Sequence, residues 1–134
     1  MDECGRNLLP RNCSTADRYS RDEPERPSVS YSTVSIDDVE PVAGAMRFLR
    51  EPLDCEQVGV TVLDCEPGWT GKTHDHAEDG QEEVYLLLEG EATVEVDGED
   101  VSLSGGDALR IPPESERTIR NGETESTFVL VGAP

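Results

Sequence analysis

Short runs in which apolar and polar residues alternate cover most of the chain beyond its N-terminal region, which is the pattern of β-strands rather than of amphipathic helices. Residues 57–64 place Val58, Val60 and Val62 at alternate positions, which predicts a half-buried strand. Residues 83–90 are apolar at both parities, so we expect a strand that is covered on both faces. Gly, Pro, Asn and Asp residues separate these runs at short intervals and indicate turns.

The clearest turn signal is Asp97-Gly98, which lies between the alternating runs 91–96 and 99–103. Asp and Gly both tolerate positive φ, so this two-residue loop favours a type I′ hairpin. The register that it implies pairs Val96 with Glu99, Val94 with Val101, Ala92 with Leu103, Thr93 with Ser102 and Glu95 with Asp100. Apolar residues then meet on one face and polar residues on the other, so the hairpin is expected to have one dry and one wet side.

About eight short strands are expected, with no convincing helix, and this predicts an all-β sandwich or barrel. The further expected strands are 33–36, part of 105–113, 117–121 and 126–131, whereas the pattern leaves the type of 42–49 open. Residues 1–30 are rich in Arg, Asp, Glu, Ser and Pro and have almost no apolar periodicity. We therefore expect a disordered N-terminal tail over 1–30 and one folded domain over 31–134.

The charge balance is strongly acidic and concentrated in the predicted domain. Thirty acidic residues stand against eleven basic ones, for a formal net charge of −19 at pH 7. Residues 31–134 hold twenty-four of the acids and six of the bases. Such a surface repels nucleic acid and anionic lipid, so neither is expected as a partner. The acid-rich, Lys-poor composition resembles that of haloarchaeal proteins and favours a halophilic source, the alternative being an ordinary acidic cytosolic protein.

No apolar run reaches the ~18 residues that span a bilayer, and the N-terminus lacks the apolar stretch of a signal peptide. A cytoplasmic location is therefore expected. Cys4, Cys13, Cys55 and Cys65 form no Cys-x-x-Cys pair, so neither a zinc ribbon nor a secreted disulfide framework is indicated. We expect reduced thiols at Cys55 and Cys65, with a disulfide between them as the alternative.

The candidate chemistry lies between residues 68 and 90. His74 and His76 are the only histidines, and on a strand their i, i+2 spacing sends both side chains to one face. Glu82 and Glu83 open the next strand, so a carboxylate can complete a His₂-carboxylate set. Such a set suits Fe(II), Mn(II), Ni(II) or Zn(II) and leaves open coordination positions. The alternative is that the two histidines are ordinary surface residues.

These residues resemble the first motif of the cupin superfamily, which runs Gly, five residues, His-x-His, three or four residues, Glu, six residues, Gly. Gly68, His74, His76, Glu83 and Gly90 fit it, except that six residues separate His76 from Glu83. The resemblance implies an antiparallel jelly-roll β-barrel in which His74, His76 and Glu83 point inward and hold a divalent transition metal. Glu83 is preferred to Glu82 because of its distance from Gly90.

The second cupin motif runs Gly, five residues, Pro-x-Gly, two residues, His, three residues, Asn. Gly106, Pro112 and Asn121 fit it, whereas Glu114 replaces the Gly and Arg117 stands where the fourth metal ligand would be. Arg has no lone pair for a metal. Three hypotheses follow for Arg117: it binds a substrate carboxylate or phosphate at the pocket, it pairs with Glu83 in place of the metal, or it points outward.

Tyr85 shares the parity of Glu83, so it either lines the pocket and contacts substrate or is an ordinary core aromatic. The resemblance implies a metal-dependent enzyme of dioxygenase or isomerase type that acts on a small polar or anionic substrate. The alternatives are a non-catalytic ligand-binding cupin and a metal-free cupin that serves as an interaction domain, since the fold hosts many activities. A homodimer is also expected, because the strand over 83–90 needs a second covering layer, which could be a partner subunit or, alternatively, the N-terminal strands.

Overall fold

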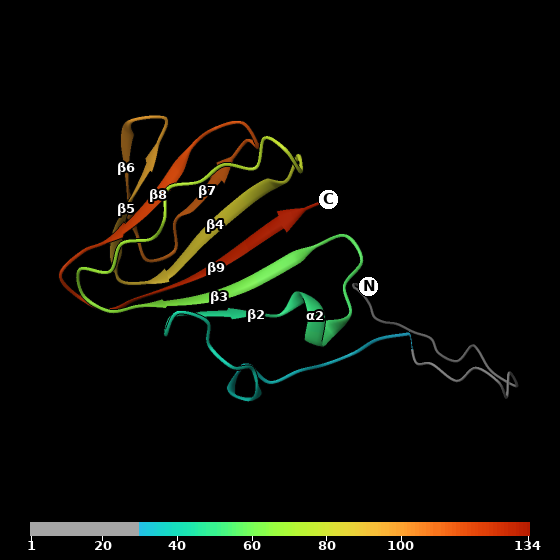
Figure 1. Ribbon diagram of the computed structural model, residues 1–134. Helices are drawn as coiled ribbons and strands as arrows, with labels where there is room; N and C mark the ends of the chain where they lie inside the picture. Colours follow the sequence, from blue (N-terminus) through green and yellow to red (C-terminus); the bar gives the residue numbers. More distant parts are fainter. Residues whose placement is uncertain (1–29) are drawn as a thin grey trace, which may run out of the picture. The chain divides into compact units, whose positions relative to one another are not determined.

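Two antiparallel β-sheets make up the folded unit Thr33–Pro134 in the computed structural model, which describes residues 30–134 (Figure 1). The predicted tail over 1–30 lies outside the described residues, apart from Ser30, and stays a prediction. Two of the four cysteines, Cys4 and Cys13, also lie outside them.

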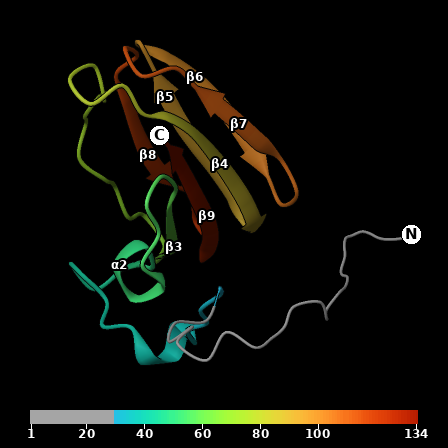
Figure 2. The ribbon, with the colours of Figure 1, turned by 90° about the vertical axis from the view of Figure 1, so that its right-hand side faces the viewer.

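The larger sheet has five strands and the smaller has three, so the predicted count of about eight is confirmed. The larger sheet runs in the order β2 (Met46–Phe48), β3 (Gly59–Cys65), β9 (Ser126–Ala133), β4 (Glu82–Glu89) and β7 (Ala108–Ile111). The smaller one runs β6 (Glu99–Ser104), β5 (Glu91–Val96) and β8 (Arg117–Asn121). Only two short helical turns interrupt the strands of the described part, η1 (Ile36–Asp38) and α2 (Arg50–Leu53). In Figures 1 and 2, α2 lies near β3 and away from the smaller sheet.

The hydrophobic core lies between the two sheets, because every strand turns alternate side chains inward. Both sheets contribute buried residues: Leu63, Cys65, Tyr85, Leu87, Ile111 and Phe128 from the larger, and Ala92, Val94, Leu103 and Ile119 from the smaller. With so few aromatic residues in the chain, branched aliphatic side chains fill most of this volume. The predicted all-β jelly-roll fold is thereby confirmed.

The β5–β6 hairpin has the register that the turn predicted. Val96 pairs with Glu99 and Val94 with Val101 around the loop, and the three other predicted pairs are also present. Asp97 and Gly98 have φ of 51° and 85°, the positive values that a type I′ turn requires. A local signal fixed this register because the loop length and the residue types of the turn leave one alignment.

Two other expectations need correction. Residues 33–36 form no strand: Ser35 accepts a hydrogen bond from the Asp37 N–H and begins η1, so this segment turns instead of pairing. In β3 the fully buried residues are Leu63 and Cys65, at the parity opposite to the predicted valine face. The valines are partly buried because their side chains take the other face of the sheet.

Strand β4 was expected to be covered on both faces, by N-terminal strands or by a partner subunit, and within the described residues one face is buried. Tyr85 and Leu87 are buried against the core, whereas Val84 and Leu88 on the other parity are 38% and 49% exposed. Residues 42–49, whose type the sequence left open, contain the bridge at Val42 and the short strand β2. None of the helices within residues 30–134 has the length and apolar character that crossing a bilayer would need.

Candidate metal centre

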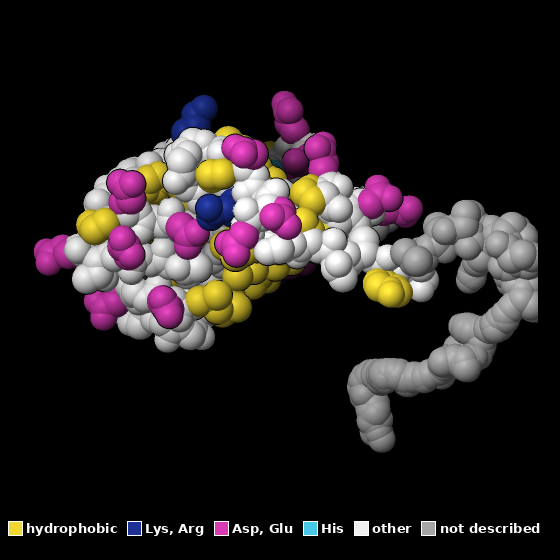
Figure 3. All heavy atoms as spheres, turned by 90° about the horizontal axis from the view of Figure 1, so that it is seen from below, with side chains coloured by type: hydrophobic (Ala, Val, Ile, Leu, Met, Phe, Trp, Pro, Cys, Tyr) yellow, Lys and Arg dark blue, Asp and Glu magenta, His cyan; other side chains and the backbone are white. Residues whose placement is uncertain are grey.

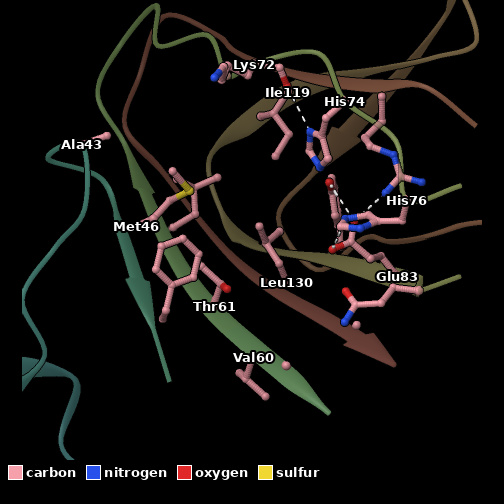
Figure 4. A pocket seen from close by; sticks show the side chains of 18 of the residues that line it. Ala43, Met46, Val60, Thr61, Lys72, His74, His76, Glu83, Ile119 and Leu130 are labelled. Carbon is pink, nitrogen blue, oxygen red and sulfur yellow. Dashed lines mark hydrogen bonds and ion pairs between the residues drawn. The ribbon is translucent and has the colours of Figure 1, made fainter. Parts of the chain in front are cut away.

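A cavity of about 760 Å³ opens on the inner face of the larger sheet. Its walls come from β2, β3, β4, β8, β9 and the segment 69–76 that precedes β4. All five residues proposed from the sequence as site residues line it: His74, His76, Glu83, Tyr85 and Arg117. Figure 4 shows the two histidines and Glu83 gathered on one side of this cavity.

His74 and His76 lie in an extended segment that is not one of the named strands. Two isolated antiparallel bridges to β8 fix the segment, Thr70 with Arg120 and His74 with Arg117. At the second bridge the His74 N–H donates to the Arg117 carbonyl at 3.1 Å, and the Arg117 N–H donates to the His74 carbonyl at 2.9 Å. The i, i+2 spacing still brings both rings together, with centroids 5.2 Å apart and planes at 88°. The predicted convergence is therefore present, although the segment pairs with β8 only through isolated bridges.

Hydrogen bonds at Nδ1 leave Nε2 of each histidine available as a ligand atom. His74 Nδ1 lies 3.2 Å from the Lys72 carbonyl oxygen, which can only accept, so Nδ1 carries the proton. His76 Nδ1 lies 3.1 Å from both carboxylate oxygens of Asp79. This hydrogen bond holds the pKa of the Asp79 carboxyl below its usual value. Carbonyl and carboxylate partners at Nδ1 are the usual outer contacts of metal-binding histidines.

Glu83 divides its two carboxylate oxygens between different partners. Oε1 accepts hydrogen bonds from Arg117 Nη1 at 2.5 Å and from the Tyr85 hydroxyl at 3.2 Å. Oε2 lies 3.4 Å from His76 Nε2. With a single proton on His76, placed on Nδ1, two lone pairs face each other across this distance, and either a metal ion between them or a second proton on Nε2 offsets their repulsion. The candidate ligand atoms of His74, His76 and Glu83 all lie within 4.8 Å of one another.

Arg117 is buried and does not point outward, which removes one of the three hypotheses for it. The residue is 1% exposed. Besides its contact with Glu83, Nε donates to the Ser115 carbonyl at 3.0 Å and Nη2 to the Pro112 carbonyl at 2.7 Å. Its guanidinium thus ties the turn before β8 to the acidic member of the cluster. The two other hypotheses, substrate binding and pairing with Glu83, both remain compatible with this placement.

Tyr85 both packs in the core and lines the cavity, and its contact with a substrate stays a prediction. It is 1% exposed and packs edge-to-face against Phe128 with ring centroids 6.4 Å apart, so it is a core aromatic. It also lines the cavity and donates its hydroxyl proton to Glu83. Burial raises the pKa of the Tyr85 hydroxyl, and the neighbouring Glu83 charge acts in the same direction. Tyr85 therefore remains a neutral hydrogen-bond donor.

Sequence reasoning missed several features of the site. Asp79, the partner of His76, follows it by three residues in an acidic loop, and that spacing was the only available signal. The apolar wall of the cavity had no sequence signal, since Met46, Phe48 and Leu130 come from strands far apart in the chain. Trp69 is half-buried, packs against the core and lines the cavity.

Comparisons with known proteins agree with this geometry. The family model described as Cupin domain matches residues 61–132. A cupin protein from Bacteroides fragilis aligns with a TM-score of 0.69 and 25% identity, covering 79% of this chain and 86% of its own. A predicted oxalate decarboxylase from Thermotoga maritima aligns with a TM-score of 0.64 and 23% identity, over 76% of this chain and 98% of its own.

A sugar phosphate isomerase of the cupin superfamily from Silicibacter pomeroyi is also similar, with a TM-score of 0.64 and 18% identity over 77% of this chain and 76% of its own. Among curated proteins, none matches the chain. The family match spans more than half of the sequence and both motifs, and the two-sheet fold and the clustered histidines agree with it. This chain belongs to the cupin superfamily.

Proposed function

We propose that the protein binds one divalent transition metal ion through His74, His76 and Glu83. The observation that carries the proposal is that one candidate ligand atom from each of His74, His76 and Glu83 lies within 4.8 Å of the other two. Two imidazoles and one carboxylate suit Fe, Mn, Ni or Zn and leave coordination positions for water or substrate.

The metal, when bound, would supply a Lewis acid or an oxygen-binding centre. The side chains of the chain itself do the positioning. Arg117 and Tyr85 hold Glu83 Oε1, so that Oε2 is the oxygen turned toward the histidines. Asp79 and the Lys72 carbonyl fix the histidine rings. We expect Arg117 and Tyr85 to lie next to a bound substrate, because both line the same cavity.

The geometry of the site indicates the metal ligands more directly than it indicates the class of reaction. We propose metal-dependent chemistry of dioxygenase or isomerase type on a small polar or anionic molecule, with a non-catalytic ligand-binding cupin as the alternative. Two of the similar proteins are a predicted oxalate decarboxylase and a sugar phosphate isomerase, which name different reactions. The fold therefore does not choose between them. Oxygen uptake and isomerase turnover over a panel of small acids and sugars separate these options.

A second candidate function rests on the Arg117–Glu83 pair. Arg117 stands at the position of the fourth motif ligand and neutralises Glu83 at 2.5 Å. In a metal-free protein this ion pair, with a proton on His76, would satisfy the same carboxylate. The domain would then act in binding alone, as an interaction module.

Metal analysis of matched variants tests both candidates. Glu82 and Glu83 are neighbours on β4, but Glu82 pairs with Arg110 on the other face. We expect stoichiometric metal in the wild type and in Glu82→Gln, and a loss of at least about tenfold in affinity in Glu83→Gln and His76→Ala. A wild type that takes up no metal after reconstitution with Fe, Mn, Ni and Zn would leave the metal-free candidate.

The charge of the chain supports a proposal about its environment. Many acidic and few basic side chains are visible on the face shown in Figure 3. Self-repulsion among them opposes folding in dilute buffer, and molar salt screens it to within ~3 Å. We propose a halophilic, cytoplasmic protein. We also propose that it works as a homodimer, in which the partner covers the exposed Val84 and Leu88 of β4. Equal free energies of unfolding in dilute buffer and in molar KCl would argue against the halophilic source.

A further inference from the structure

The cavity is much larger than a metal ion and its first ligands need, and its far wall is apolar. Its volume of about 760 Å³ lies in the range of pockets that hold drug-sized organic molecules. In Figure 4 Met46 lies across the cavity from Glu83, and Leu130 lies between them. Phe48 also lines the cavity and is 46% exposed, a large apolar surface left without cover among the described residues.

Half of the basic side chains of the domain line the cavity, and two of these make no ion pair within residues 30–134. Six basic residues occur in residues 31–134, and Arg47, Arg110 and Arg120 pair with carboxylates. The other three, Arg50, Lys72 and Arg117, line the cavity. Arg117 is held by Glu83, whereas Arg50 and Lys72 form no ion pair with any described residue.

Arg50 and Lys72 differ in this from the other four basic residues of the domain, although twenty-four acidic residues are present to pair with them. Arg50 is also partly fixed, because its Nη2 donates to the Gln57 carbonyl at 3.0 Å. Its Nη1 and Nε make no hydrogen bond with described residues, so they are available to a ligand. A low-dielectric wall beside unpaired cations concentrates anions and strengthens their binding.

We propose that the ligand of this cavity is an organic anion with an extended apolar body. The body packs on Met46, Phe48 and Leu130, and the acidic group binds Arg50, with Lys72 adding attraction from a different wall. This inference deepens the proposed function, because it names the substrate class of the same cavity. The apolar wall and the two cations do not depend on the metal, so the anion is expected to bind metal-free protein as well.

Trp69 gives a direct readout, because it is the only tryptophan and it lines the cavity. Chelator-treated protein is titrated with octanoate, with the uncharged octanamide and with the short anion acetate, while Trp69 emission is recorded. We expect saturable binding of octanoate at least about tenfold tighter than either comparison ligand, since it alone has both the charge and the apolar chain. Octanoate that binds no better than acetate and octanamide overturns the proposal.

Matched variants locate the two halves of the ligand. Arg50→Gln and Lys72→Gln are each expected to weaken octanoate at least about threefold and to leave octanamide unchanged. Arg110→Gln removes the same charge outside the cavity and is expected to change neither. Lys72 is exposed, so its variant tests the proposal even if Arg50→Gln disturbs the loop that it contacts.

Phe48→Ala is expected to weaken octanoate and octanamide alike, whereas Leu88→Ala, an equally exposed residue outside the cavity, changes neither. Full octanoate affinity in both the Lys72 and Phe48 variants contradicts the placement. Octanoate binding without metal uptake would support the anion site and contradict the metal site. Metal uptake without octanoate binding would support the metal site and contradict the anion site.

Discussion

Two neighbouring glutamates on β4 show how differently the two faces of the larger sheet behave. Each pairs with an arginine: Glu82 with Arg110 and Glu83 with Arg117. The outer pair is exposed, with 51% of the Glu82 side chain and 63% of the Arg110 side chain accessible. The inner pair is buried, with 13% of Glu83 and 0% of Arg117 accessible. One residue of displacement along the strand separates solvent from the cavity.

The comparison shows that two Glu–Arg ion pairs can contribute very differently to the free energy of unfolding. Water and salt screen the outer pair, so such contacts contribute ~0–1 kcal/mol. The inner pair has lost its hydration, and removal of one partner leaves an uncompensated buried charge. Burial therefore keeps Glu83 in one orientation, whereas Glu82 is free to reorient.

Replacement of the two arginines should give the largest contrast. Arg117→Met is expected to lower the free energy of unfolding by about 3–5 kcal/mol, because Glu83 and two backbone carbonyls lose their donor. Arg110→Met is expected to lower it by less than about 1 kcal/mol. Urea unfolding of the metal-free proteins measures both. Equal losses in the two variants would mean that the faces do not differ in the way the burial indicates.

The sequence indicated that Glu82 and Glu83 take opposite faces, because side chains alternate along a strand. It did not say which face was inside, and only the cupin spacing to Gly90 favoured Glu83. The β5–β6 register was predictable because the Asp97-Gly98 turn is local. The partners of Arg117 were not, because the contact with Glu83 joins residues thirty-four positions apart.

A similar limit applies to the segments that the pattern misassigned. Residues 33–36 have strand-like composition, yet the Ser35 cap and the acidic residues after it favour a turn. The valines of β3 have the right period, but period alone cannot tell the core face from the outer face. The apolar wall of the cavity is formed by residues of two strands far apart in the chain, β2 and β9, so it appears only when the sheet is assembled.

The two described cysteines offer a second contrast between inside and outside. Cys65 is buried in the core, whereas Cys55 is partly exposed after α2. Burial raises the pKa of the Cys65 thiol from 9.0 to about 12, with the Asp64 charge adding to the effect. We expect iodoacetamide to modify Cys65 at least ~100-fold more slowly than Cys55 at pH 8, because only the thiolate of an opened state reacts. Peptide mass spectrometry of the native protein measures both rates, and equal rates in urea are the control.

The same shift predicts a pH dependence of stability. Below pH 9 the Cys65 thiol is protonated in both the folded and the unfolded chain, so it adds no slope. Above pH 9 the unfolded chain loses this proton and the folded chain keeps it until about pH 12, so the free energy of unfolding falls across that window. The difference in stability between wild type and Cys65→Ala should therefore shrink as the pH rises from 9. A constant difference would contradict the raised pKa.

Hydrogen bonds on the two faces give a smaller contrast. Tyr85→Phe removes the buried donor of Glu83 and is expected to cost about 1 kcal/mol of unfolding free energy. On the outer face Thr127 Oγ1 donates to Asp64 at 3.1 Å, and water can replace it. Thr127→Val is therefore expected to stay within about 0.5 kcal/mol of the wild type. Urea unfolding measures both, and a larger loss in the Thr127 variant would reverse the assignment of the faces.

The smallest expected effect is the salt dependence of the outer pair. A double-mutant cycle with Glu82→Gln and Arg110→Gln should give a coupling energy of about 0.2–1 kcal/mol at low ionic strength. Molar KCl shortens the screening length to ~3 Å, so the coupling should fall toward zero. The corresponding cycle at Glu83 and Arg117 should keep its coupling, because ions do not enter the buried contact. An outer coupling that persists in KCl would show that Glu82 and Arg110 are held by more than their charges.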